Sequence, residues 1–389
     1  MRQEKPTLYW DNAATTWPKP VSVHRAIMDA MNKCGGNPGR AGHRMSMEAA
    51  EHIFACRQEI AEFFGLADPT GVVFTLNCTM ALNMVIQGVV RQGGRVLISD
   101  LEHNAVWRTA CALEPFGSRV DIARWSPNAE ETVENFRRQI RPDTRLLVCT
   151  HASNVFGVTF PVRELAQLAH RYGVPLCVDA AQSAGVLPIN METDEIDYLC
   201  VAAHKGLYAP MGTGVLLCRE MQKMPAFVRG GTGSQSENPR QPEELPDRLE
   251  SGTPNVLGIC GLLAGVRFVQ NRGRDAIYRH ELGLVRRLYN WLQECKGVTL
   301  YTERPQIGAA VPVLSVNVEG LSSEQTAVLL HGHGVAVRAG LHCAPLAHKR
   351  FGTLPSGTVR LAPSAFTREE EVEKLHKLFS QIAQKTLHT

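Results

Sequence analysis

Short apolar runs alternate with helical stretches between about residue 45 and residue 225. Strands that alternate with helices are typical of α/β folds in which helices cover a mostly parallel sheet. Six runs of this kind are Val72–Thr75, Arg95–Ser99, Arg145–Cys149, Leu176–Val178, Tyr198–Val201 and Gly214–Cys218. The pattern therefore predicts a large α/β domain, a class of fold that places its ligands at the carboxyl ends of the strands.

The C-terminal part of the chain has a different pattern. Residues 229–254 are rich in glycine, proline and glutamate and predict a long loop, which in a compact protein is usually functional. A long helical region over about 255–295 is expected to lead into a smaller α/β part. Its predicted elements are strands near Val313–Val318 and Thr358–Leu361 and a charged final helix over about 367–385.

A chain of 389 residues is too long for one ordinary hydrophobic core and favours one large domain with a smaller companion. We predict three parts. Residues 1–20 form an N-terminal segment that packs on the small domain and the active site, and residues 21–255 form a large cofactor-binding domain. Residues 256–389 form a connecting helix and a small C-terminal domain.

The charges are balanced, with a formal net charge of +3 and both signs interspersed. This distribution argues against nucleic acid or a membrane surface as a partner and favours a small-molecule substrate. Residues 1–6 lead to Tyr9 without the apolar core of a secretory signal, and no apolar run is long enough to span a membrane.

The eleven cysteines include no C-x-x-C pair, and many of them lie inside apolar runs. This spacing argues against a disulfide framework and against a zinc site, so we expect no metal. Most of these cysteines are expected to be small buried hydrophobes in a protein of the reducing cytoplasm.

Two polar motifs at the ends of predicted strands indicate a pyridoxal 5'-phosphate site. Asp179 and Gln182 follow one apolar run, and His204 and Lys205 follow the next. A lysine in such a place can form a Schiff base. A carboxylate opposite a pyridine nitrogen keeps that nitrogen protonated, which makes the ring an electron sink. The alternative is a helix cap beside a surface Lys-His pair.

Other strands are followed by side chains that would complete this site. Thr79 lies where a strand gives way to a helix, so it is either a phosphate contact or an ordinary helix cap. His103 is expected to stack on the pyridine ring and to exchange protons. Asn154 is expected to donate to a substrate carboxylate, although asparagine is equally common in turns.

Two arginines and one cysteine stand out in the C-terminal part. Arg360 lies inside an apolar strand, where its guanidinium suits a substrate carboxylate, and an internal salt bridge is the alternative for both Arg360 and Arg338. Cys343 lies between a glycine and a proline and is expected in a loop. Cationic groups and His342 would give it a usable thiolate fraction, unless it is a buried structural cysteine.

Four motifs follow one another in a characteristic order. They are Val178-Asp179-Ala180-Ala181-Gln182, His204-Lys205, Glu250-Ser251-Gly252-Thr253-Pro254-Asn255 and Arg338-Ala339-Gly340-Leu341-His342-Cys343-Ala344. In these motifs the chain resembles the class V aminotransferase-fold enzymes, specifically the compact subgroup of the cysteine desulfurase and selenocysteine lyase family with a short cysteine loop. The likeness runs from Asp11 to Arg360 and implies fold type I of the pyridoxal phosphate-dependent transferases.

The resemblance implies a role for each cofactor-binding residue. Lys205 would hold the cofactor as an imine, Asp179 would pair with the pyridine nitrogen, Gln182 would contact the phenolic oxygen, and His103 would stack on the ring. The implied contacts to the phosphate come from Thr79, His204 and, across a homodimer interface, the partner subunit's Thr253.

The resemblance also implies a substrate site and a reaction. Asn154 and Arg360 would fix the carboxylate of cysteine or selenocysteine, while His43 and Arg338 would line the pocket. The freed lysine amine would remove the Cα proton, and Cys343 would then attack the sulfur or selenium. Alanine would leave, and the persulfide or selenosulfide would pass to a thiol acceptor or be released by a reductant.

Some residues depart from the family pattern. Related enzymes often have a phosphate-binding serine at the position of Ala202 and a histidine at the position of Leu341, and residues 229–249 are too polar and proline-rich for the hairpin of many relatives. The alternatives are a pyridoxal phosphate-dependent β-eliminating lyase, epimerase or aminotransferase that does not use the thiol, and a noncatalytic sulfur-transfer scaffold. The choice between sulfur and selenium stays open.

Overall fold

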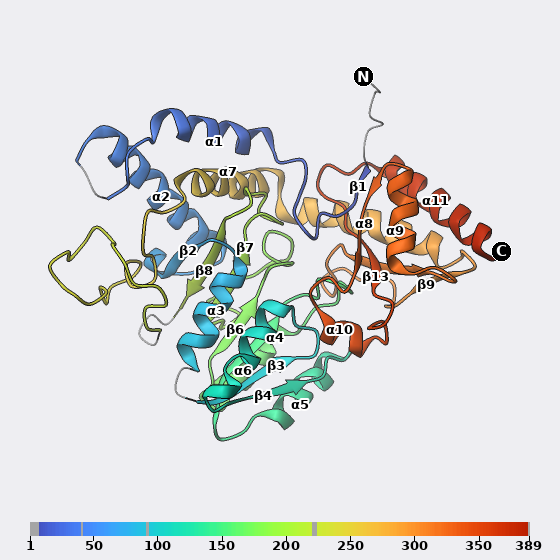
Figure 1. Cartoon of the computed structure of the whole chain (residues 1–389), viewed down its shortest axis with the longest axis horizontal. Coiled ribbons are helices and arrows are strands. Elements are labelled where there is room, and N and C mark those ends of the chain that lie inside the picture. Colours follow the sequence, from blue (N-terminus) through green and yellow to red (C-terminus); the bar gives the residue numbers. More distant parts are fainter. Residues whose placement is uncertain (1–7, 40–41, 91–92, 220–223, 388–389) are drawn as a thin grey trace.

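The computed structural model describes residues 8–39, 42–90, 93–219 and 224–387. Residues 1–7 of the predicted N-terminal segment lie outside this part of the chain. Figure 1 shows two parts side by side, one built on a seven-stranded sheet and the other on a four-stranded sheet. The α/β architecture predicted from the alternation of strands and helices is confirmed.

The large sheet has the strand order β2-β8-β7-β6-β5-β3-β4. Its strands are β2 (Val72–Thr75), β3 (Gly94–Ser99), β4 (Ser118–Ala123), β5 (Thr144–Thr150), β6 (Leu176–Asp179), β7 (Tyr198–Ala202) and β8 (Gly214–Cys218). Four neighbouring pairs are parallel, and only the two pairs that involve β8 are antiparallel. The mostly parallel sheet is confirmed, and so are all six predicted strands.

The strand of the large sheet that the sequence analysis missed is β4, at the edge of the sheet. Its polar residues Arg119 and Asp121 interrupt the apolar pattern, and only its first and last residues are buried. The inner strands are buried on both faces and therefore appear as unbroken apolar runs. An edge strand with one open face lacks that signal.

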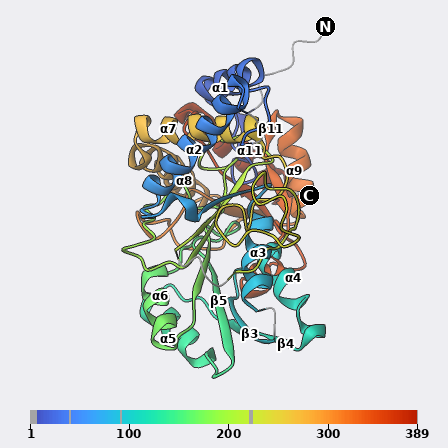
Figure 2. The same ribbon diagram turned by 90° about the vertical axis from the view of Figure 1, so that its left-hand side faces the viewer.

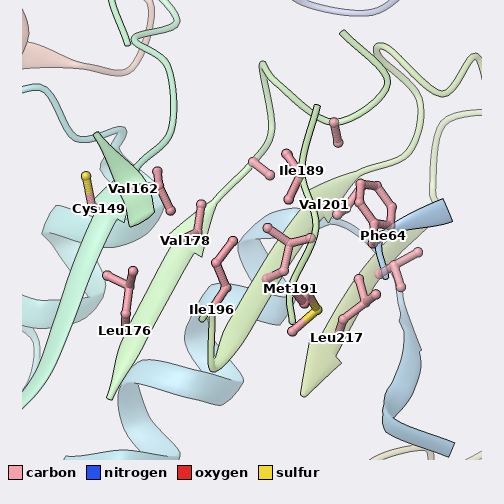
Figure 3. Close-up of a cluster of buried hydrophobic side chains, with 14 of the residues drawn as sticks. Phe64, Cys149, Val162, Leu176, Val178, Ile189, Met191, Ile196, Val201 and Leu217 are labelled. Atoms are coloured by element: carbon pink, nitrogen blue, oxygen red, sulfur yellow. The ribbon is translucent and has the colours of Figure 1, made fainter. Parts of the chain in front are cut away.

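Helices cover both faces of the large sheet. They are α1 (Val21–Lys33), α2 (Arg44–Phe63), α3 (Cys78–Val89), α4 (Asn104–Cys111), α5 (Ala129–Gln139) and α6 (Val162–Arg171). Alternate side chains of each strand enter opposite cores: Leu176 and Val178 face one and Cys177 faces the other. Figure 3 shows the first of these cores, with Val201 and Leu217 from neighbouring strands beside Leu176 and Val178.

The long helical region predicted after the large sheet is confirmed and consists of two helices. α7 (Val256–Arg272) and α8 (Arg274–Leu292) meet at Gly273, whose φ of 84° is a left-handed conformation that interrupts the helix. α7 packs against α1 and α2, as Figures 1 and 2 show. Residues 224–255 contain neither helix nor strand, which confirms the predicted long loop.

The smaller sheet is antiparallel, with the order β12-β13-β10-β9. The two predicted strands and the final helix are confirmed in this region. Its elements are β9 (Val298–Leu300), β10 (Leu314–Val318), α9 (Ser323–Gly332), β12 (Arg338–Gly340), α10 (Pro345–Arg350), β13 (Thr358–Leu361) and α11 (Glu369–Leu387).

The N-terminal strand is attached to the smaller part of the molecule. β1 (Leu8–Tyr9) pairs in parallel with β11 (Val335–Ala336), and Asp11 forms a bridge to Ala362 just beyond β13. The domain limits predicted at residues 20 and 255 stay predictions. Within the described ranges, every helix is too short or too polar to cross a lipid bilayer.

Candidate active site

A pocket of about 200 Å³ lies at the carboxyl edge of the large sheet. Parallel strands bring the residues that follow them to one edge, so polar side chains far apart in the sequence meet there. The predicted site residues that line the pocket are Thr79, His103, Asn154, Asp179, Gln182, His204 and Lys205.

Asp179 is the last residue of β6 and is only 3% exposed. Its Oδ1 accepts a hydrogen bond from the Ala181 N–H at 2.9 Å and another from the Cys78 thiol at 3.5 Å. A buried carboxylate held by two donors is oriented by the backbone rather than by solvent. It is placed to receive a hydrogen bond from a protonated ring nitrogen in the pocket.

Lys205 lies in the turn after β7. Burial, assisted by Arg360, lowers the pKa of its amine to about 8, while Asp179 opposes the shift. The turn needs a glycine at position 206, because a Cβ there would lie 2.3 Å from the Ala184 carbonyl oxygen. A lysine with this pKa is partly neutral near neutral pH and can attack a carbonyl carbon.

Two histidines of the pocket are neutral near pH 7. Burial lowers the pKa of His103 and of His204 to about 4 each, and the charge of Lys205 lowers both further. His103 caps α4, with Nδ1 accepting from the Ala105 N–H at 3.0 Å, so its proton resides on Nε2. The Nδ1 atom of His204 is buried and has no hydrogen-bond partner among the described residues.

The first turn of α3 borders the pocket. Its cap is Asn77, whose Oδ1 accepts from the Met80 N–H at 2.9 Å, so the alternative in which Thr79 is the cap is wrong. Thr79 lines the pocket within this first turn. Helix starts leave N–H groups without intrahelical partners and carry a positive dipole, which together suit an anion such as phosphate.

The side-chain amides of Gln182 and Asn154 connect the pocket to other segments. Gln182 Nε2 donates to the Ala13 carbonyl oxygen at 3.0 Å. Asn154 Nδ2 donates to the carbonyl oxygen of His342 at 2.8 Å. The N-terminal segment and the loop that carries Cys343 are therefore both bonded to the pocket.

Arg360 is 1% exposed and forms the internal ion pair that was the alternative prediction for it. Its Nη2 donates to Asp11 Oδ1 at 2.9 Å, and its Nη1 donates to the Asn154 carbonyl oxygen at 3.0 Å. Burial lowers the pKa of the guanidinium. Nε is buried and has no partner among the described residues. Donor capacity therefore remains for a substrate carboxylate.

Cys343 lies in the loop between β12 and α10, as predicted, and is half-buried, which rules out a wholly buried structural cysteine. Arg338 Nη2 lies 3.6 Å from its Sγ atom. The Cys343 carbonyl oxygen accepts from the Asn104 N–H at 2.6 Å, so the loop is bonded to the residue next to His103. The predicted cationic neighbour of the thiol is therefore Arg338.

His342, which the sequence analysis expected to act on the Cys343 thiol, has its ring bonded elsewhere. Its side chain is buried, and its Nε2 lies 2.9 Å from the Thr358 carbonyl oxygen, which only an N–H can bond. Burial, with a smaller contribution from Arg360, lowers its pKa to about 2. The ring is therefore neutral and bonded to β13 of the small sheet.

Two further predicted site residues lie outside the pocket of their own chain. His43 is exposed and caps α2, with Nδ1 accepting from the Ser46 N–H at 3.3 Å. Thr253 is exposed, and its hydroxyl accepts from Asn37 Nδ2 at 3.3 Å. Neither residue lines the pocket that contains Lys205.

The sequence analysis missed three residues at the site. Asp11 pairs with Arg360, and Cys78 contacts Asp179. Lys19 donates from Nζ to the carbonyl oxygen of His204 at 2.7 Å, and burial lowers its pKa to about 8. The only available signals were the place of Asp11 in an N-terminal motif and that of Cys78 beside Thr79.

The donor set fits pyridoxal phosphate. The pocket contains an amine that is partly neutral, a buried carboxylate opposite it, a neutral imidazole, and a helix start beside the unpaired Nδ1 of His204. These groups suit an aldehyde carbon, a pyridinium nitrogen, an aromatic face and a phosphate. Among the described residues, no cluster of three or more His, Cys, Asp or Glu side chains could hold a metal ion.

The fold and this pocket define a class of protein that the comparisons also identify. The Aminotransferase class-V family matches residues 8–375, and the chain belongs to that family. It is 30% identical to a probable cysteine desulfurase of Synechocystis sp. over 98% of this chain and 91% of that protein. It is also 30% identical to a cysteine desulfurase of Shigella flexneri, over 95% of this chain and 92% of that protein.

A solved structure has nearly the same fold. A cysteine desulfurase from Thermococcus onnurineus superposes with a TM-score of 0.90 at 31% identity, covering 97% of this chain and 95% of that one. The resemblance that the four sequence motifs indicated is thereby confirmed at the level of the family and the fold.

Proposed function

We propose that the protein is a pyridoxal 5'-phosphate-dependent cysteine desulfurase that converts L-cysteine to L-alanine and keeps the sulfur as a persulfide on Cys343. The observation that carries the proposal is the 2.6 Å bond between the Cys343 carbonyl oxygen and the N–H of Asn104. This bond attaches a thiol-bearing loop to the residue next to His103, which itself lines a pocket suited to amino-acid chemistry. A lyase, epimerase or aminotransferase would not need a thiol at that place.

The cofactor would be bound by the pocket residues already described. Lys205 would hold its aldehyde carbon, Asp179 its ring nitrogen and Gln182 its phenolic oxygen, with His103 against the ring. Thr79 and His204 would contact the phosphate. When bound, the cofactor supplies an electron sink that stabilises negative charge at the substrate Cα and makes the Cβ–S bond labile.

The reaction needs proton transfers for which Lys205 is suited. With its pKa lowered to about 8, the amine released by substrate is a base strong enough to take the Cα proton near neutral pH. His103, neutral with its proton on Nε2, can donate to or accept from substrate atoms in the pocket. Asp179 stays in place through its two donors and exchanges no proton with the substrate.

Sulfur transfer then takes place at Cys343. The thiolate attacks the substrate sulfur, an S–S bond forms, the Cβ–S bond breaks, and the carbon fragment takes up protons to leave as alanine. Arg338 donates from Nη2 to Sγ at 3.6 Å and so orients the sulfur for this attack. A reductant or a thiol of an acceptor protein would then remove the sulfur.

The substrate carboxylate would be held by Arg360 and Asn154. Arg360 is kept rigid by Asp11 and by the Asn154 backbone, so the guanidinium is oriented before the substrate arrives. A planar guanidinium can accept a carboxylate in two parallel hydrogen bonds. The ion pair to Asp11 and substrate binding then use different N–H groups.

We further propose a homodimer with shared sites. His43 and Thr253 lie outside the pocket of their own chain, where a second subunit could bring them to the opposite pocket. Exposed large apolar side chains support such an interface: Leu76, next to the pocket residue Asn77, is 62% exposed, and Met211 is 71% exposed. We also assign the protein to the cytoplasm, because all eleven cysteines are free thiols.

The activity is tested by alanine release from L-cysteine and from L-selenocysteine by the cofactor-loaded protein with a reducing thiol. Turnover of cysteine, blocked in Cys343→Ala, is the expected result. Alanine from selenocysteine alone would instead mark a selenium-specific lyase, and pyruvate in place of alanine would mark a β-eliminating lyase. Alanine from neither substrate would overturn the proposed function.

The shared site is tested by mixing two inactive variants, Lys205→Ala and Thr253→Asp. The aspartate would repel the cofactor phosphate, and it is introduced at an exposed position, so the fold should survive. If Thr253 acts across the interface, a mixed dimer contains one site with both substitutions and one intact site, and activity returns. If Thr253 acts within its own chain, both sites are damaged and no activity returns.

A further inference from the structure

Cys78 is the one thiol that both lines the pocket and touches Asp179. It is the first residue of α3 and is 7% exposed. Its Sγ donates to Asp179 Oδ1 at 3.5 Å. Burial, together with the charge of Asp179, raises the thiol pKa well above its usual range, so this sulfur stays protonated. Cys78 therefore acts as a hydrogen-bond donor and not as a second nucleophile.

Several ionisable groups beside Asp179 are neutral, so the hydrogen bonds that its carboxylate receives become important. Lys205 is committed to the cofactor in the proposed site, and His103 is neutral because burial lowers its pKa to about 4. Glu102, the other buried carboxyl beside Asp179, has its pKa raised by burial to about 8 and is neutral at pH 7. The hydrogen bonds that Asp179 receives from the described residues come from the Ala181 N–H and the Cys78 thiol.

A proton shared between a carboxylate and a pyridine nitrogen moves toward the more basic partner. Each hydrogen bond donated to the carboxylate stabilises its charged form and makes it less basic. The proton then stays on the nitrogen, and the ring keeps the positive charge that makes it an electron sink. A thiol is a weak hydrogen-bond donor, so its contribution to the stability of the charged carboxylate is modest.

We propose that Cys78, by donating its S–H to Asp179, keeps the shared proton on the cofactor ring nitrogen and so sets how strongly the cofactor withdraws electrons. Cys78 is a positioning residue that acts through Asp179 and has no contact of its own with the reacting atoms. The proposal rests on the proposed function, since it requires pyridoxal phosphate bound at Lys205.

The test uses the holoenzyme loaded with pyridoxal phosphate that carries ¹⁵N in its ring. The ¹⁵N chemical shift reports the protonation of the ring nitrogen independently of turnover. In Cys78→Ala the ratio of protonated to neutral ring nitrogen should fall about threefold, as expected for loss of one weak hydrogen bond to a charged group. Cys78→Ser retains a donor and should restore the ratio to the wild-type value or above.

Cys218→Ala is the matched control. Cys218 is a buried cysteine, 2% exposed on β8, and its electrostatic neighbours do not include Asp179. The Cys218→Ala variant leaves a similar small cavity in the same core, so the ¹⁵N shift of its cofactor should equal that of the wild type. An equal loss in all three variants would show a structural effect and overturn the proposal.

The outcomes separate this proposal from the proposed function. A wild-type protein that forms no adduct with pyridoxal phosphate at Lys205 would overturn the proposed function. A wild type that binds the cofactor, with an unchanged ¹⁵N shift in Cys78→Ala, would overturn only the role of Cys78. A serine variant that behaves like the alanine variant would also overturn it, because the donor would then have no effect.

Discussion

The pocket of the large sheet and the Cys343 loop of the small sheet are built in opposite ways. In the pocket, Asp179 and Lys205 follow wholly buried strands, and burial lowers the pKa of the amine. In the loop, His342 and Cys343 have left-handed φ values of 48° and 58°, and the thiol is half-buried. The difference suits the proposed roles: Asp179 and Lys205 would stay in place during the reaction, whereas Cys343 would pass its sulfur to an acceptor outside the pocket.

The largest effect should come from the pocket. Lys205→Ala removes the amine that we propose binds the cofactor and acts as the base, so alanine formation should fall by at least about 10³-fold. The visible absorbance of the lysine-bound cofactor should disappear with it. Circular dichroism serves as the control for folding. An unchanged visible spectrum would show that another group holds the cofactor.

The loop should behave differently when its nucleophile is removed. Cys343→Ala should lower alanine formation from cysteine on the order of 10²-fold, because no thiol accepts the sulfur. Cofactor absorbance and affinity should not change, because Cys343 lies outside the pocket lining. Cys295→Ala removes another partly exposed thiol and should retain full activity. A coupled loss of cofactor in Cys343→Ala would contradict the separation of the two regions.

The pocket should show a pH dependence set by Lys205. Because its pKa is lowered to about 8, the neutral fraction of the amine is about one tenth at pH 7 and most of the total at pH 9. The rate of cofactor capture by the cofactor-free protein should therefore rise nearly tenfold over this range and then level off. Stopped-flow absorbance measures it.

Lys19 provides the control for this pH profile. Burial lowers its pKa to about 8 as well, but it is not among the groups that shift Lys205. Lys19→Met should therefore keep the midpoint of the profile. A midpoint near 10.5, the usual value for lysine, would contradict the desolvated environment assigned to Lys205.

The smallest effect should come from the cation beside the thiol. Arg338→Gln removes the charge 3.6 Å from Cys343 Sγ. Alkylation of Cys343 by iodoacetamide at neutral pH should slow about threefold, because the sulfur loses the Nη2 donor that orients it. Peptide mass spectrometry measures the rate at this cysteine. Arg350→Gln, in α10 and paired with Asp100, should leave it unchanged.

Much of the pocket could be predicted because polar residues directly follow buried apolar strands. Asp179 and Lys205 have this arrangement, and the mostly parallel topology brings them to one edge. Cys78 could not be found in this way, since a cysteine beside a helix cap gives no sign of the carboxylate it will meet. The charge state of His342 was also out of reach, because it depends on how the small sheet covers the ring.

The break at Gly273 illustrates a local signal that was present but not used. A glycine between two amphipathic stretches can adopt the φ of 84° that separates α7 from α8. The edge strand β4 is the opposite case, since its polar residues hide it until the neighbouring β3 is in place. Local residue preference decided the first feature, and long-range pairing decided the second.

By itself, the sequence determined the alternation of strands and helices, the order of the polar motifs and the membership of a family whose members share them. These follow from local periodicity and residue type, which act over a few neighbouring positions. Only the tertiary structure decided that Arg360 pairs with Asp11, that Arg338 rather than His342 faces the thiol, and that Cys78 touches Asp179. Contacts and pKa values of this kind depend on burial and on distances between segments remote in the chain, which no local pattern contains.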